Sequence, residues 1–231
     1  MIWSTVRRWR WVSRVKLGLW SLQNPGSSFK QFYAESVATA LSGEKNHSSL
    51  GPNLKPGRIA EARRTFSKLV KKGIRPSDTF VDYGCGTLRL GALFIEFLEP
   101  DRYIGLDIDE RILAIGRNQI SAKLLDSKRP VLEVISPESL RRAAARQPRW
   151  VCSKGVLQHV SPEELNEYFE NLSCLIRIGA TGFIYARIAE KSKRHSTKTW
   201  LHEFNHLRAA ANRHGMEVDR IAKGLITVRS H

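Results

Sequence analysis

From Arg58 to the C-terminus, short segments rich in β-branched and aromatic residues alternate with longer amphipathic segments. The short segments are typical of buried strands, and the longer ones repeat apolar residues with the period of an α-helix. This alternation favours a doubly wound α/β fold with a mostly parallel sheet. The predicted strands are Thr79–Tyr83, Tyr103–Asp107, Val131–Ile135, Trp150–Ser153, Gly182–Ala189, Met216–Ala222 and Leu225–Arg229.

The predicted helices begin at capping residues and end at glycine or proline. Ser136 begins one helix, and Ser161 with Glu164 forms a capping box that begins another. The last two strands are linked by only two residues and must therefore pair antiparallel. The other predicted helices are Phe29–Leu41, Ile59–Lys72, Leu88–Leu98, Glu110–Leu125 and Thr199–His214.

The chain divides into a basic, Trp-rich extension, residues 1–57, and a main α/β domain, residues 58–231. Residues 1–34 contain no acid and hold four of the six tryptophans. Basic residues interleaved with Trp suit an anionic membrane surface or a nucleic-acid backbone. Two other interpretations remain open: a lid whose tryptophans pack on the main domain, and a transit peptide.

Bulk composition narrows the class of protein. Lys and Arg number 38 against 22 for Asp and Glu, a formal charge of +16, which attracts polyanions. No apolar run approaches the roughly 18 residues of a membrane span. Three scattered cysteines, Cys85, Cys152 and Cys174, do not make a disulfide framework or a zinc cluster. We therefore expect a cytoplasmic protein, with peripheral attachment to a membrane as an option.

The first predicted strand runs into a glycine-rich loop, GCGTLR at residues 84–89, and then into a helix. In open α/β sheets, ligands bind beyond the carboxyl ends of the strands. Gly84 and Gly86 allow a tight turn and close approach of a ligand to the backbone. Asp107, at the end of the second strand, is placed to accept hydrogen bonds from a ribose diol. Asp109 is the second candidate, although a helix cap explains it as well.

The loop departs from two known patterns at one position each. The dinucleotide fingerprint G-x-G-x-x-G needs a last glycine where this chain has Arg89. The methyltransferase loop, acid-x-G-x-G-x-G, has its third glycine where this chain has Leu88. Together, GCGTLR and YIGLD at 103–107 resemble a subset of class I S-adenosylmethionine (SAM)-dependent methyltransferases, which carry G-C-G-x-L-R and Y-x-G-x-D. The resemblance covers roughly residues 79–189. It implies a Rossmann-like methyltransferase fold of seven strands, with an antiparallel terminal hairpin after the parallel strands and the extension before them.

The resemblance implies SAM as the cofactor and a methyl group as the group transferred. Asp82 would then accept a hydrogen bond, directly or through water, from the cofactor's ammonium. Arg89 would contact the methionine carboxylate, or would only pair with a surface acid. No residue is assigned to the adenine. The predicted cofactor-binding residues are Asp82, Gly84, Cys85, Gly86, Arg89, Asp107, Ile108, Ser153, Lys154 and Gly155.

His159 follows the fourth strand, where the resemblance implies a place close to the cofactor. Its ordinary pKa near neutrality would suit a general base. Alternatively, it fixes the loop by hydrogen bonding. If the acceptor must lose a proton, His195 and His202 are further candidates.

The methyl acceptor is not identified by the sequence. Signatures of nucleic-acid amino-methylating and RNA cytosine-C5 enzymes are absent, which favours a small-molecule, sugar or lipid-linked acceptor. The basic charge instead favours RNA or another anionic substrate. A second hypothesis is a non-catalytic module that binds nucleic acid or membrane, in which Leu88 prevents the pocket from binding the cofactor.

A third hypothesis is a zinc hydrolase. Residues 202–206 read HEFNH, the H-E-x-x-H pattern of zinc proteases, which places two histidines on one helix face. However, a third ligand could come only from His214, Glu217 or Asp219, and none has the usual context.

Overall fold

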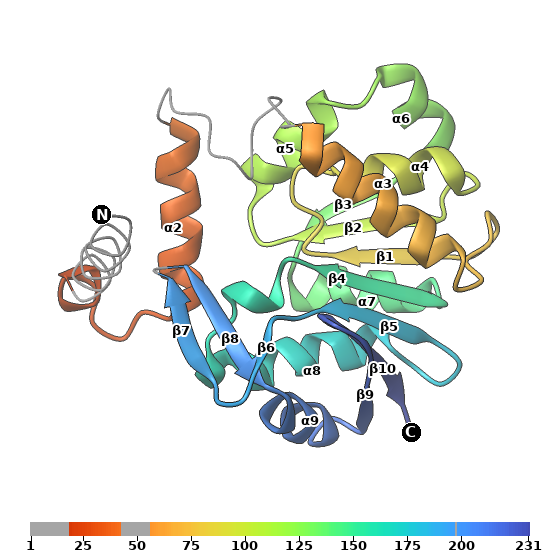
Figure 1. Cartoon of the computed structure of the whole chain (residues 1–231). Helices are drawn as coiled ribbons and strands as arrows, with labels where there is room; N and C mark the ends of the chain where they lie inside the picture. The colour runs from red at the N-terminus through yellow and green to blue at the C-terminus, as the bar shows by residue number, and fades with distance from the viewer. Residues whose placement is uncertain (1–18, 43–55, 197) are drawn as a thin grey trace.

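The described part of the chain, residues 19–42, 56–196 and 198–231 of a computed structural model, is built around a seven-stranded sheet (Figure 1). The strand order is β3-β2-β1-β4-β5-β10-β9. β1 to β5 run parallel, and β10 pairs antiparallel with both β5 and β9, which confirms the predicted sheet and its terminal hairpin. The strands are β1 (Phe80–Tyr83), β2 (Tyr103–Asp107), β3 (Val131–Val134), β4 (Trp150–Lys154), β5 (Thr181–Tyr185), β9 (Met216–Ala222) and β10 (Leu225–Ser230).

Helices cover both faces of this sheet, as a doubly wound fold requires (Figure 1). One face carries α3 (Pro56–Val70), α4 (Gly91–Phe97), α5 (Glu110–Asn118) and α6 (Ala122–Lys128). The other carries α7 (Pro137–Ala145), α8 (Leu165–Leu175) and α9 (Phe204–Asn212). A further helix, α2 (Phe29–Ser42), stands at one end of the sheet. None of the described helices is long and apolar enough to cross a membrane.

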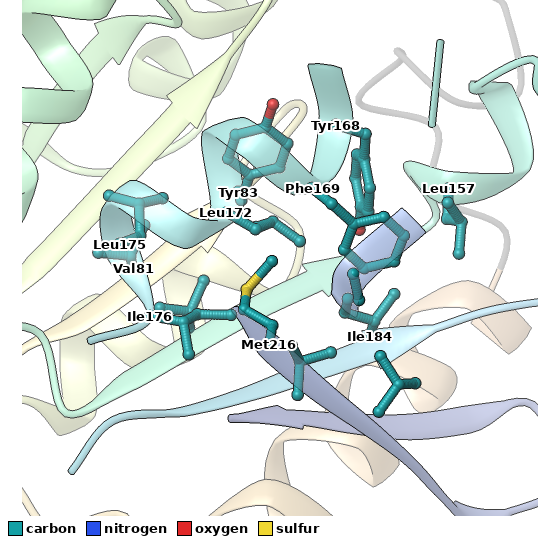
Figure 2. Close-up of a cluster of buried hydrophobic side chains, with 14 of the residues drawn as sticks. Val81, Tyr83, Leu157, Tyr168, Phe169, Leu172, Leu175, Ile176, Ile184 and Met216 are labelled. Atoms are coloured by element: carbon teal, nitrogen blue, oxygen red, sulfur yellow. The ribbon is translucent and has the colours of Figure 1, made fainter. Parts of the chain in front are cut away.

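Two apolar clusters hold the helices on the sheet. Figure 2 shows one of them, in which Leu175 of α8 lies beside Val81 of β1. On the opposite face, Phe94 of α4 stacks on Phe80, with ring centroids 4.0 Å apart. Apolar burial stabilises by about 25 cal/mol per Å². Packing on both faces therefore fixes β1 and the loop that follows its carboxyl end.

The single helix predicted over Glu110–Leu125 is wrong, because the chain forms two helices there. α5 ends at Asn118, and Ser121 has an extended backbone and caps α6. The Ser121 hydroxyl accepts a hydrogen bond from the Leu124 amide at 3.3 Å. Serine is a favoured N-cap, and here it begins the second helix.

A small sheet of order β6-β8-β7 lies beside the main sheet and was not predicted. Its strands are β6 (Ile188–Ala189), β7 (Lys193–Ser196) and β8 (Thr199–Glu203). The strand predicted over Gly182–Ala189 is therefore split into β5 and β6, and the helix predicted over Thr199–His214 begins only at Phe204. Thr199 and Trp200 favour strands and pair with β7, and the next part of β8, His202 and Glu203, pairs with β6.

Candidate active site

A cavity of about 800 Å³ lies at the carboxyl ends of β1, β2 and β4. β1 lies between β2 and β4, so the strand order reverses here, and such reversals form the ligand crevice of open α/β sheets. Nine of the ten predicted cofactor-binding residues line the cavity, together with His159. The nine are Asp82, Gly84, Cys85, Gly86, Arg89, Asp107, Ile108, Lys154 and Gly155.

The two glycines after β1 have different physical roles. Gly84 and Gly86 both have positive φ, at +78° and +58°. A Cβ on Gly84 would lie 2.0 Å from Val156 Cγ2, so no larger residue fits there. A Cβ on Gly86 would meet nothing within 4 Å, because this glycine faces the cavity. Gly84 therefore permits the turn, and Gly86 leaves the backbone open to a ligand.

Asp107 is buried at the end of β2 and faces the cavity. Its Oδ2 accepts a 2.7 Å hydrogen bond from the Gly86 amide, and its Oδ1 accepts one of 2.9 Å from the Ile108 amide. Burial raises the pKa of Asp107 to about 6, although these hydrogen bonds lower it. Each oxygen keeps a lone pair for a ligand hydroxyl. Asp109 instead caps α5 by accepting from the Arg111 amide.

Asp82 is buried near the end of β1, and its Oδ2 accepts a 3.0 Å hydrogen bond from the Tyr103 hydroxyl. Burial raises the pKa of Asp82 to about 7. The nearby Asp107 carboxylate raises it further, whereas the Tyr103 hydrogen bond lowers it. A cationic ligand group in the cavity would relieve the cost of the buried charge.

Leu88 does not line the cavity, although it occupies the position of the third loop glycine. Its φ of +59° is left-handed, the conformation that glycine adopts most easily. The side chain is buried against Gly91 and Gly116, where an added Cβ would lie 3.0 and 2.8 Å from it. The helix predicted from Leu88 begins only at Gly91, because the left-handed backbone of Leu88 cannot belong to a right-handed α-helix. Leucine here fills the core and leaves the pocket open.

Four charged residues form one corner of the cavity: Arg58, Glu61, Arg89 and Lys154. Lys154 Nζ donates to Glu61 Oε1 at 2.7 Å, and Lys154, Arg58 and Arg89 together lower the pKa of Glu61. Burial lowers the pKa of the half-buried Arg89 guanidinium, and Arg58 lowers it further. Three cations against one acid make this corner suited to an anionic group.

Ser153 is the predicted cofactor-binding residue that does not line the cavity. It is fully buried, and its hydroxyl accepts a 2.8 Å hydrogen bond from the Tyr168 hydroxyl of α8. Strand alternation turns Ser153 toward α8, whereas its neighbours Lys154 and Gly155 reach the cavity.

His159 forms part of the cavity wall, and both of its ring nitrogens are in hydrogen-bond contact. Nδ1 is 2.5 Å from the Lys198 carbonyl, which can only accept, so Nδ1 carries the proton. The Gln158 amide nitrogen lies 3.2 Å from both His159 Nε2 and the Gly155 carbonyl. The Tyr33 ring stacks on the imidazole, with centroids 4.4 Å apart. This geometry favours the loop-fixing interpretation of His159.

The zinc-site hypothesis fails on secondary structure. His202 belongs to β8 and His206 to α9, so the two do not share a helix face. His202 Nε2 is 2.9 Å from the Leu157 carbonyl, and His206 Nδ1 is 3.0 Å from the Ser192 hydroxyl. Within residues 19–42, 56–196 and 198–231, no group of three or more His, Cys, Asp or Glu side chains could hold a metal ion.

Solved structures with the same arrangement include several methyltransferases. Magnesium protoporphyrin IX methyltransferase from Synechocystis PCC 6803, with bound SAM, has a TM-score of 0.61 and 16% identity, over 90% of this chain and 100% of that one. The mitomycin 7-O-methyltransferase MmcR has a TM-score of 0.60 and 15% identity, and the match covers 96% of this chain and 68% of that one. The glycopeptide N-methyltransferase MtfA has a TM-score of 0.53 and 12% identity, and the match covers 76% of this chain and 90% of that one.

The chain has the class I methyltransferase fold. The fold match rests on structure, since no protein-family model and no curated protein matches the sequence.

The methyltransferase fold brings further residues to the cavity that the sequence did not single out. Ile112 and Ile135 join Ile108 as an apolar wall beyond Asp107. Ile135 is the last residue of the third predicted strand, and that position at a strand end was the available signal. Tyr33 comes from α2, which lies far from the other lining residues in sequence, so only the tertiary structure reveals it.

Proposed function

We propose that this chain is a SAM-dependent methyltransferase. The observation that carries the proposal is the pairing of Gly86 with Asp107 at the adjoining ends of β1 and β2, on the wall of a cavity of about 800 Å³. An exposed backbone next to a buried carboxylate suits a nucleoside, whose ribose hydroxyls donate to the acid.

The cavity matches the separate parts of SAM. Asp107 would hold the ribose, and Ile108, Ile112 and Ile135 offer an apolar wall for the adenine. Asp82 would accept from the ammonium, directly or through water. The space beside Gly86, where a Cβ would meet nothing, lets a ligand lie against the loop backbone.

Arg89 and Arg58 would neutralise the methionine carboxylate. Both guanidinium groups border the cavity, and the pKa lowering of Arg89 by Arg58 reflects two cations brought together. A carboxylate beside them would relieve this repulsion. Lys154, paired with Glu61, completes the corner.

Bound SAM would supply an electrophilic methyl group on its sulfonium. The chain's own residues then mainly hold the acceptor in line with that methyl group, which is an orientation effect. The hydrogen bonds of His159 hold the loop after β4, and Tyr33 covers the ring. We assign no general base.

We propose a small-molecule acceptor, which can be anionic. The cavity volume lies within the range of small-molecule sites, about 300–1,000 Å³. Arg187 adds a cation to the wall, whereas Lys30 lines it paired with Glu167, 2.7 Å from Nζ to Oε1. Lys30 and Tyr33 belong to the extension, residues 1–57, so we propose that the extension acts as a lid. The membrane or nucleic-acid contact predicted for residues 1–34 falls largely on residues 1–18, which lie outside the described residues.

The non-catalytic alternative rested on Leu88 spoiling the pocket. The Leu88 side chain is buried in the core instead, which removes that reason.

Thermal unfolding with and without SAM and S-adenosylhomocysteine tests the proposal. A ligand at 100 times its dissociation constant should stabilise the fold by about 2.7 kcal/mol. For a chain of this size the melting temperature should rise by roughly 5–10 °C. Absence of any rise at millimolar ligand would contradict the proposal. Release of S-adenosylhomocysteine in the presence of candidate small molecules would then identify the acceptor.

A further inference from the structure

The β7–β8 hairpin and the helical segment of residues 19–23 both pack against α2 (Figure 1). We call the surface that they present the hairpin surface and define it by Leu19, Leu22, Lys191, Lys193 and Arg194. It takes no part in the cofactor site, because none of these five residues lines the cavity.

A row of aromatic contacts joins the two halves of the hairpin surface. Trp20 packs edge-on against Phe32 of α2, with centroids 5.3 Å apart, and Phe32 lies 5.9 Å from Phe29. Phe29 packs edge-on against Trp200 of β8 at 5.9 Å. The Arg194 guanidinium lies 5.9 Å from the centroids of both Phe29 and Trp200. The hairpin is therefore fixed against α2.

The charge of this surface is strongly positive. Residues 190–198 contain four basic residues, Lys191, Lys193, Arg194 and Lys198, and one acid, Glu190. One further acid, Glu35 of α2, accepts a 2.6 Å hydrogen bond from Trp20 Nε1, so the basic residues remain in excess. Lys191 and Lys193 are exposed. A cationic strand at the border of a sheet also resists edge-to-edge pairing, so charge alone does not identify a partner.

Exposed aliphatic side chains accompany the charge. Leu22 is 80% exposed and Leu19 is 55% exposed. They stand three residues apart in a helical segment, residues 19–23, and therefore share one face. Exposed leucines beside lysines are typical of helices that lie in a membrane interface, where the apolar face enters the lipid and the cations meet anionic headgroups.

We propose that the hairpin surface docks on a lipid bilayer that carries anionic headgroups. Single-stranded nucleic acid is the other polyanion to consider, and it is bound by aromatic rings that stack on bases. Here Trp20, Phe29, Phe32 and Trp200 pack against one another, and the exposed groups include Leu19, Leu22, Lys191 and Lys193. Charge complementarity and exposed aliphatic groups together favour lipid.

Docking would bring the cavity close to the bilayer. α2 contacts the hairpin through Phe29 and lines the cavity through Lys30 and Tyr33, while β8 lines it through Thr199. The proposal does not depend on methyltransferase activity, and its test uses no cofactor.

The test is flotation of the full chain with vesicles at physiological salt. One set contains phosphatidylcholine alone and the other contains added phosphatidylglycerol. The chain should bind the anionic vesicles and not the neutral ones. Each lysine near an anionic surface contributes about a fivefold gain in binding. Lys191→Glu with Lys193→Glu should therefore lower binding at least about tenfold, and Leu22→Ser should lower it several-fold.

The matched control is Lys71→Glu with Lys72→Glu, two exposed lysines at the end of α3, remote from the hairpin. This variant carries the same net charge and should keep wild-type binding. An equal loss in both double variants would overturn the proposal, because binding would then depend on overall charge. Unchanged binding in the hairpin variant would also overturn it. So would hairpin-dependent binding of a single-stranded RNA without binding to vesicles. Unfolding temperatures show that each variant is folded.

Discussion

The Gly86 amide donates a 2.7 Å hydrogen bond to Asp107 Oδ2 across 21 residues of sequence. This bond ties the loop after β1 to the end of β2. The two motifs that were recognised separately in the sequence therefore form one physical unit on the cavity wall, and the carboxylate is held in place before any ligand binds.

Asp107→Asn should weaken S-adenosylhomocysteine and 5′-methylthioadenosine alike, because both carry the ribose. Loss of one hydrogen bond to a charged group costs about 1.5–3 kcal/mol, so each dissociation constant should rise at least about tenfold. Isothermal titration calorimetry at pH 8 measures both. Asp109→Asn makes the same chemical change at the α5 cap and should leave both affinities unchanged. Equal losses in the two variants would contradict a ribose contact by Asp107.

Arg89→Met should separate the amino-acid end of the ligand from the nucleoside end. S-adenosylhomocysteine should bind at least about tenfold more weakly, since a charge-assisted hydrogen bond is lost. 5′-Methylthioadenosine lacks the carboxylate and should bind as it does to the wild type. Arg63→Met, on an exposed position of α3, serves as the control. Equal weakening of the two ligands would mean that Arg89 only supports the loop.

Leu88→Gly should lower stability without altering ligand affinity. Glycine relieves the left-handed backbone, a gain of about 1–2 kcal/mol, but deleting a buried leucine side chain costs about 2–5 kcal/mol. Urea unfolding should therefore show a net loss of about 1–3 kcal/mol. Leu88→Met keeps the volume and should cost less than about 1.5 kcal/mol. A changed affinity for S-adenosylhomocysteine in Leu88→Gly would show that this position does shape the pocket.

Asp82 should make the ligand-free protein less stable as pH rises. Its pKa in the fold is about 7, above the ordinary value of 3.8, so the folded state holds the proton that the unfolded state has released. The free energy of unfolding therefore falls between about pH 4 and pH 7. Asp82→Asn lacks this titration, and should gain about 1–3 kcal/mol relative to wild type between pH 5 and pH 8. Parallel urea-unfolding profiles for the two proteins across that range would refute the assignment.

Local signals in the sequence predicted most of the main sheet. β2 and β9 have the predicted bounds, and the predicted N-cap at Ser136 and capping box at Ser161 are present. The prediction failed where a helical pattern of apolar residues continued across a helix-capping residue. The predicted helix Glu110–Leu125 contains Ser121 in its interior, although the Ser121 hydroxyl caps a new helix.

Long-range pairing accounts for the other failures. Residues 199–203 lie in a segment with a helical pattern of apolar residues, and they become β8 only because β6 and β7 lie on either side. The same pairing separates His202 from His206 and removes the apparent zinc motif. Burial likewise decided the role of Leu88, whose side chain occupies the core between α4 and α5.

The sequence by itself determined the order of the strands along the chain, the antiparallel terminal hairpin and the place of Gly84, Gly86 and Asp107 at strand ends. These follow from local periodicity, turn chemistry and a two-residue link, all of which act over a few residues. Only the tertiary structure decided which charges share a corner with Arg89, why Asp82 holds its proton to about pH 7, and that Tyr33 covers His159. Those properties depend on burial and on contacts between distant segments, and neither quantity exists until the chain has folded.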